Sequence, residues 1–198
     1  MDSIDDLFKF YREEFLPAYS DLVGYIADKP TLLLTQIEST FTHIAQYFNP
    51  QLNESLKSEN LHKAKTHLIR VTLDCYKLLW ASMHSDLKKI EKDKYKRKFA
   101  LNISESEFLS KFLEFKKLAK KARRVEMESI GVDPLASLEY YKKAIEIGNE
   151  LLESVDHHKL QELESLSKNI KTIITAREFL IGVLTGIIST LIVNQIFI

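Results

Sequence analysis

The chain has 198 residues, with 28 Lys or Arg and 28 Asp or Glu, so its formal net charge is zero and gives no general attraction to nucleic acid. Its single cysteine, Cys75, excludes an intrachain disulfide and favours a reducing compartment. The acidic residues 1–6 lack the basic and apolar regions of a secretory signal, so none is expected.

Apolar residues recur at intervals of three and four along most of the chain, which predicts helices throughout. The first predicted helix covers 3–28 and bends near Pro17, where a proline interrupts the backbone hydrogen bonds. The second covers 31–48. The third runs from about residue 54 into the charged stretch 88–98. These elements predict an all-α fold.

Capping signals mark the helices that follow. Ser104 and Glu107 form a capping-box pattern that opens a fourth helix, and Gly131 lies where its C-terminal cap belongs. Asp133 and Pro134 are typical of the N-cap and first turn of a fifth helix. Because no stop signal follows, this helix is predicted to continue without a break into the last apolar segment.

The predicted helices divide the chain into three parts: a cytoplasmic helical bundle over 1–132, a long amphipathic helix over 133–178 and a C-terminal transmembrane anchor over 179–198. Apolar positions of the long helix follow a heptad from Leu138 to Val155 and resume in a shifted phase after it. Such a helix either packs on its own bundle or joins a second copy in a short coiled coil. Both alternatives remain open from the sequence.

The segment 179–198 contains no ionisable side chain. Twenty helical residues span ~30 Å, the thickness of the hydrocarbon core of a bilayer. Lys168, Lys171 and Arg177 precede the segment, so the positive-inside rule places the N-terminal part in the cytoplasm. We therefore expect a single-pass, tail-anchored protein of the cell membrane. The alternative is a C-terminal helix or hairpin buried in the bundle.

Small or polar residues occupy every fourth position of this segment and share one helix face: Gly182, Gly186, Thr190 and Asn194. Small residues allow two helix backbones to approach closely in lipid. A polar side chain such as Asn194 is costly against acyl chains, which favours a neighbouring helix, a water-filled lumen or the far interface. The face therefore predicts a homo-oligomer in the lipid membrane.

A polar seam is predicted on the helix that contains residues 59–80. His67, Arg70 and Asp74 share a narrow arc, and Arg70 and Asp74 lie one turn apart, close enough to pair. A buried charge without a partner costs several kcal/mol. The seam is therefore either a structural polar network or a site that senses a partner.

The run of His67, Arg70, Asp74 and Tyr76 on a central helix resembles the HEPN-like superfamily, whose members are often ribonucleases or their inactive relatives in prokaryotic defence systems. Their ribonuclease motif is an arginine followed four to six residues later by a histidine, and no arginine of this chain has a histidine at that distance. The resemblance therefore implies a membrane-associated accessory protein of the kind found with type VI CRISPR systems, or a small membrane effector that accompanies short prokaryotic Argonautes.

Ten basic residues form a further predicted site, the basic patch, around the connection between the third and fourth helices. They are Lys94, Lys96, Arg97, Lys98, Lys116, Lys117, Lys120, Lys121, Arg123 and Arg124. On an anchored protein such residues could contact anionic lipid headgroups, at ~1 kcal/mol each near the surface. They could also bind an acidic protein or phosphates, or form a solvated face. Nucleic acid is not directly supported.

No catalytic site, metal or cofactor is predicted. His157 and His158 lie near three carboxylates, but adjacent histidines point to different sides of a helix, so a solvated face is expected there. The chain has no Gly-rich phosphate loop and no nucleophile elbow.

The sequence supports a non-enzymatic membrane effector of antiviral defence as the leading hypothesis. A cytoplasmic protein partner would activate the bundle, and the oligomerised span would perturb or depolarise the membrane. One alternative is a membrane-anchored adaptor or scaffold that recruits a soluble partner. A second alternative is a divergent HEPN-type ribonuclease.

Overall fold

The computed structural model describes the backbone of residues 3–196 and the side chains of residues 3–170, 173–175, 177–183 and 185. Over residues 3–196 every regular element is helical, which confirms the predicted all-α class. The elements are α1 (Ile4–Phe10), the π-helix η1 (Tyr11–Phe15), α2 (Leu16–Ile26), α3 (Thr31–Tyr47), α4 (Glu54–Lys92), α5 (Lys94–Phe99), α6 (Glu105–Glu128), α7 (Leu138–Glu153) and α8 (His157–Ile196).

The predicted bend near Pro17 is a π-turn in an otherwise continuous helical segment formed by α1, η1 and α2. The N–H of Leu16 donates to the carbonyl of Tyr11, five residues earlier, instead of four. Pro17 has no N–H to donate, and in an α-helix its ring would press on the carbonyl of Glu13. The wider π-turn accommodates the proline without ending the helix.

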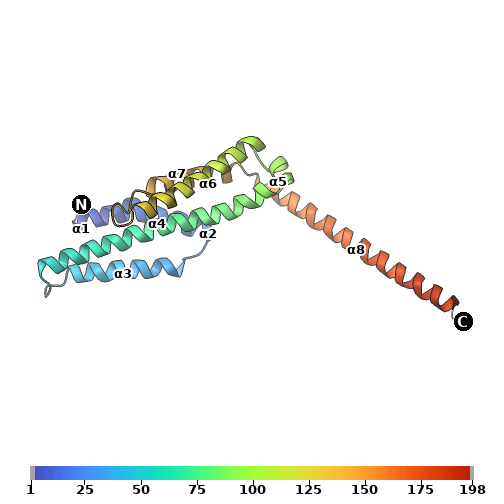
Figure 1. Cartoon of the computed structure of the whole chain (residues 1–198), viewed down its shortest axis with the longest axis horizontal. Coiled ribbons are helices and arrows are strands. Elements are labelled where there is room, and N and C mark those ends of the chain that lie inside the picture. The colour runs from blue at the N-terminus through green and yellow to red at the C-terminus, as the bar shows by residue number, and fades with distance from the viewer. Residues whose placement is uncertain (1–2, 197–198) are drawn as a thin grey trace.

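Helix α4 is the central element of the bundle. It has 39 residues, so it is ~58 Å long, and it packs against α2, α3, α6 and α7 (Figure 1). Leu68, Ile69, Val71, Thr72 and Leu73 are all buried although they point in different directions around the helix. A helix that is buried on several faces must be surrounded by others.

Helix α4 ends within the charged stretch 88–98, as the sequence predicted. It ends at Lys92, and Asp93 opens the separate helix α5 by accepting hydrogen bonds from the N–H groups of Tyr95 and Lys96 at 2.9 and 3.1 Å. Ser104 is the N-cap of α6, as predicted, because its hydroxyl accepts from the N–H of Glu107 at 3.2 Å.

The prediction of one unbroken helix from about residue 134 is wrong, because the chain breaks between α7 and α8. Val155 forms an isolated β-bridge with Leu101. On either side of it, the N–H of Asn102 donates to Ser154 and the N–H of Asp156 donates to Ala100, both at 2.8 Å. These long-range backbone bonds replace helical ones. The carboxylate of Asp156 then caps α8 by accepting from the N–H of Lys159.

Helices α7 and α8 therefore have different surroundings. Helix α7 buries Leu138, Tyr141, Ala144 and Leu151 and packs against α6 and α4, as one of the two sequence alternatives proposed. Helix α8 instead leaves the end of the bundle near α5 and projects away from it as a long, straight rod (Figure 1).

Candidate functional site

The base of α8 is attached to α5. Lys96 on α5 makes an ion pair with Glu164 on α8, with 2.6 Å between Nζ and Oε1. Next to this pair, Tyr95 lines a groove together with Leu163, Leu166 and Ile170 of α8. The groove is open, so the apolar side of α8 is covered only in part by its own bundle.

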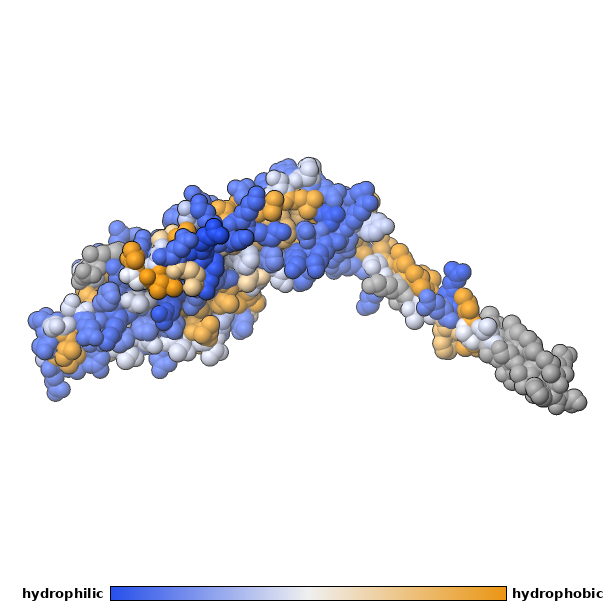
Figure 2. Space-filling view, viewed as in Figure 1, coloured by the Kyte–Doolittle hydropathy of each residue, from blue (hydrophilic) through white to orange (hydrophobic). Residues whose placement is uncertain are grey.

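Along this groove and beyond it, the described part of α8 exposes many apolar side chains, and Figure 2 shows orange atoms between blue ones there. The exposed residues are Leu166, Ile170, Ile173, Ile174, Phe179, Leu180, Ile181 and Val183. Phe179 is 71% exposed and Ile173 is 68% exposed. An exposed apolar surface of this size indicates a site that contacts a membrane or another protein.

The structure describes the side-chain surroundings of only the first residue of the predicted oligomerisation face. Gly182 is described, and a Cβ added to it would have nothing within 4 Å. The side chains at Gly186, Thr190 and Asn194 lie outside the described residues. Within the part of the chain that the structure describes, no helix has an apolar stretch long enough to cross a bilayer. The anchor over 179–198 remains a prediction.

The predicted polar seam does not converge on one point. The Nδ1 of His67 lies 2.8 Å from Oε1 of Gln36, and its ring stacks on His43 of α3 at 5.3 Å between centroids. Arg70 is exposed. The carboxylate of Asp74 pairs with Lys77 at 2.6 Å, and the described side chains show no Arg70–Asp74 ion pair. Asp74 therefore pairs with Lys77 and not with Arg70, on the side of α4 where Lys77 also reaches Glu126 of α6.

Burial lowers the pKa of His67, and the positive charges of His43 and Arg70 lower it further. The neutral imidazole is therefore favoured at this position, between α3 and α4. A neutral, hydrogen-bonded histidine is consistent with a structural role, and partner sensing by the seam stays a prediction.

A carboxylate that sequence reasoning missed, Glu126, connects three helices. It accepts from Lys77 of α4 at 3.1 Å, from Arg123 of α6 at 3.0 Å and from the hydroxyl of Tyr141 of α7 at 3.2 Å. Burial alone would raise the pKa of Glu126, but the hydrogen bonds from Arg123 and Lys77 outweigh it and the pKa is lowered. No local motif marks this residue, because its partners come from distant parts of the chain.

The basic patch is two clusters. Lys94, Lys96, Arg97 and Lys98 lie on α5, and the other six residues begin at Lys116, which is ~16 Å along α6 from its start. On α5, Lys96 pairs with Glu164, and Arg97 pairs with Glu105 at 2.7 Å and with the carbonyl of Glu91. Two of the four cations of this cluster are thus already neutralised.

The α6 cluster lies on the outer side of the bundle. Arg123 is paired with Glu126, while Lys116 and Lys121 place their ammonium groups 4.6 and 4.5 Å from the ring centroids of Phe112 and Tyr140. The remaining members are exposed: Lys117, Lys120 and Arg124. This cluster keeps more uncompensated positive charge than the α5 cluster does.

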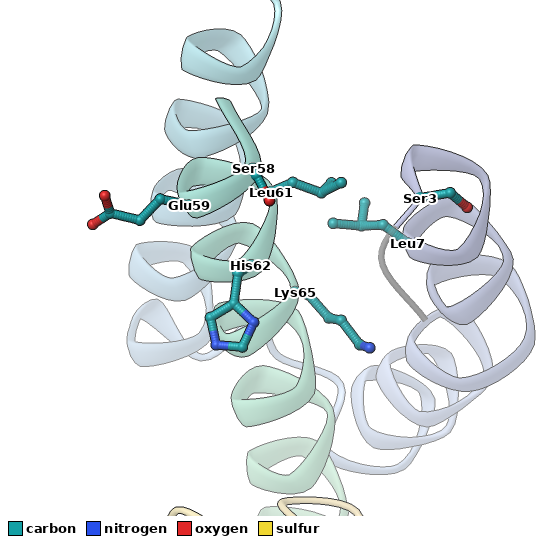
Figure 3. A pocket seen from close by; sticks show the side chains of 7 residues that line it. All are labelled: Ser3, Leu7, Ser58, Glu59, Leu61, His62 and Lys65. Carbon is teal, nitrogen blue, oxygen red and sulfur yellow. The ribbon is translucent and has the colours of Figure 1, made fainter. Parts of the chain in front are cut away.

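A small pocket between α1 and the start of α4 offers little chemistry. Figure 3 shows Leu7 and Leu61 pointing toward each other across it, while Glu59 points away. Glu59 is bound to Lys63 at 2.7 Å, and the hydroxyl of Ser3 accepts from the N–H of Asp6. These polar groups serve local structure and do not form a catalytic set.

The histidine pair at the start of α8 lies on the surface. The Nδ1 of His158 lies 3.5 Å from Glu162, and both side chains are mostly exposed. Within the described residues, no three His, Cys, Asp or Glu side chains come close enough to hold a metal ion.

No protein-family model matches this chain, and neither a curated protein nor a solved structure is similar enough to count as a relative.

Proposed function

We propose that this protein is a membrane-anchored effector whose bundle stands outside the bilayer and whose helix α8 carries both the anchor and the contacts between copies. The observation that supports this proposal most directly is the exposed apolar surface along the projecting helix α8. The 40 residues of α8 extend ~60 Å, enough for a bilayer span and for a spacer of similar length.

The spacer part of α8 fits a parallel coiled coil with a second copy. Leu163, Leu166, Ile170 and Ile173 are separated by three, four and three residues, which is the spacing of heptad positions a and d. Ser167 and Asn169, at the e and g positions that flank Leu166 and Ile170, carry no charge that would repel a parallel partner. Anchoring two chains in one membrane would impose the same parallel direction.

The small-residue positions of the span fall on a different side of the helix from this stripe. On a straight helix, the positions of Gly182, Gly186, Thr190 and Asn194 lie roughly opposite the stripe from Leu163 to Ile173. A two-helix pair could not use both faces at once. Copies joined through both faces would form an assembly larger than a dimer, which is the kind of assembly a membrane-perturbing effector requires.

The role in antiviral defence is supported by the resemblance to HEPN-like defence proteins. In this proposal a cytoplasmic protein partner activates the bundle, and the assembled spans then depolarise the membrane. The polar residue Asn194 within the span supports the same proposal, because it would be stabilised by a neighbouring helix or a hydrated lumen.

Expression of the full chain in bacteria with a voltage-sensitive dye tests the proposal. Gly186→Leu should abolish depolarisation and reduce crosslinked oligomers, because the larger side chain keeps the helices apart. Ile188→Leu, on the opposite side of the helix, should preserve both. Recovery of the protein in the soluble fraction without detergent would contradict the anchor, and depolarisation by Gly186→Leu would contradict the oligomerisation face.

An anchored adaptor is the second candidate, and the surface of α3 favours it. Leu32, Phe41 and Phe48 are each at least 60% exposed, and only Leu33 and Thr40 of this helix are buried. An adaptor that docks a partner on α3 should lose that partner with Phe41→Ser but tolerate Gly186→Leu. The effector should instead lose its depolarising activity with Gly186→Leu.

A further inference from the structure

A groove between α4 and α6 combines aromatic rings with uncompensated positive charge. Its volume is about 470 Å³, within the range of small-molecule sites. Trp80 and His84 line it from α4, and Lys116, Lys120 and Arg123 line it from α6. No Asp or Glu is among the described residues that line it.

The aromatic side of the groove is held rigidly. The rings of Trp80 and His84 lie nearly parallel, 5.0 Å between centroids and 15° apart. Behind them, Trp80 stacks on Phe115 at 5.6 Å and His84 stacks on Phe112 at 5.7 Å. Phe112 and Phe115 are almost fully buried, so they fix the orientation of the two rings that line the groove.

The cations of the groove differ in how far they are neutralised. Arg123 is balanced by Glu126. Lys116 rests its ammonium group 4.6 Å from the Phe112 ring centroid, and in the described part of the chain neither Lys116 nor Lys120 has a carboxylate partner. Burial lowers the pKa of His84, and the nearby charges of Lys88 and Lys116 lower it further. The neutral imidazole is therefore favoured at His84, so Lys116 and Lys120 are the groups that favour an anionic ligand here.

We propose that this groove binds a nucleotide, with its base stacked on the ring array of Trp80 and His84 and its phosphate held by Lys116 and Lys120. The uncompensated lysines provide charge for a phosphate, and the aromatic rings provide a stacking surface for a planar base. A lipid headgroup or inorganic phosphate would use only the lysines. The volume suits one nucleotide better than a polymer. The site lies wholly in the bundle and does not depend on the membrane anchor.

Trp80 is the only tryptophan of the chain, so fluorescence excited selectively at tryptophan, and not at the eight tyrosines, reports on this groove. The full-length protein in detergent would be titrated with adenosine, guanosine and uridine monophosphates, and separately with ribose 5-phosphate and inorganic phosphate. At least one nucleotide should quench the fluorescence saturably. Ribose 5-phosphate and inorganic phosphate should not, because they bring no base to stack on the rings.

Charge-matched variants separate the site from general electrostatic attraction. Lys116→Ala with Lys120→Ala should raise the Kd of the nucleotide about tenfold or more, since both phosphate contacts are lost. Lys94→Ala with Lys98→Ala removes the same charge from exposed positions on α5 and should leave the Kd within about twofold.

Four results would overturn the proposal. They are no saturable quenching by any nucleotide, equal quenching by ribose 5-phosphate, equal weakening by the two lysine pairs, and binding of an oligonucleotide without any binding of mononucleotides. Because the readout is confined to the bundle, failure of the membrane anchor in the fractionation experiment would leave this test unaffected.

Discussion

Lys96 of α5 and Glu164 of α8 form an ion pair of 2.6 Å that joins the bundle to its projecting helix. The Lys96 side chain is 19% exposed and that of Glu164 is 57% exposed, so solvent screens the pair in part. Together with the backbone bonds on both sides of Val155, this pair sets the direction in which α8 leaves the bundle.

Lys96→Ala should loosen the base of α8. An exposed pair contributes ~0.2–1 kcal/mol, so amide exchange in the first turns of α8 should rise by up to about fivefold. Hydrogen exchange measured by mass spectrometry would detect this change. Lys63→Ala is the control, because Lys63 pairs with Glu59 near the start of α4, and this substitution should leave exchange in α8 unchanged. Equal exchange in all three proteins would show that the pair does not hold α8.

Gly148→Ala should destabilise the bundle. A Cβ at this position would lie 3.0 Å from both Sδ of Met83 and Cε2 of Phe115, so α7 would be pushed away from α4 and α6. We expect the free energy of unfolding to fall by ~1–3 kcal/mol in urea denaturation. Gly24→Ala, where the added Cβ meets nothing within 4 Å, should instead raise it by ~0.5–1 kcal/mol. Stabilisation by both substitutions would disprove the close approach of α7.

Ala27→Gly should stabilise the protein. Ala27 ends α2 with a φ of 53°, a left-handed conformation that is unfavourable for any side chain but natural for glycine. We expect a gain of ~1 kcal/mol in the free energy of unfolding. The same substitution at Ala81, exposed within α4, should lower it by ~1 kcal/mol. A loss at both positions would contradict the left-handed cap.

Glu126→Ala should cost ~1–3 kcal/mol of unfolding free energy, because Lys77, Arg123 and Tyr141 would lose a shared, part-buried acceptor. Glu128→Ala, two residues further on and exposed, should change the stability by less than ~0.5 kcal/mol. Urea denaturation of the two variants provides the comparison. Similar small effects would mean that Glu126 does not link the three helices.

The stability of the bundle should depend on the protonation of His67. Its folded pKa is lowered, so the unfolded chain takes up a proton first as the pH falls. This contribution to stability is therefore complete above about pH 6.5 and is lost as the pH falls from there toward the folded pKa. Urea denaturation at about pH 7.5 and about pH 5.5 should show a smaller loss in His67→Gln than in the unaltered protein. His157→Gln, at an exposed position, should behave like the unaltered protein.

The helices that the sequence predicted correctly carry local signals. Ser104 caps α6 through a hydrogen bond to Glu107, only three residues along the chain. The apolar spacing of 31–48 likewise specifies α3 without contacts to other helices. Pro17 indicates where the helix is interrupted but not how, because both a π-turn and a simple kink can accommodate a proline.

The amino-acid sequence by itself determined the all-α class and the position of most helices, because capping and apolar spacing act over a few residues. Only the tertiary structure decided that the chain breaks around Val155, that Asp74 pairs with Lys77, and that Trp80 and Lys116 share a groove. Each of these outcomes depends on packing between distant segments or on competition between neighbouring charges. The spacing of residues along the chain carries no information about either.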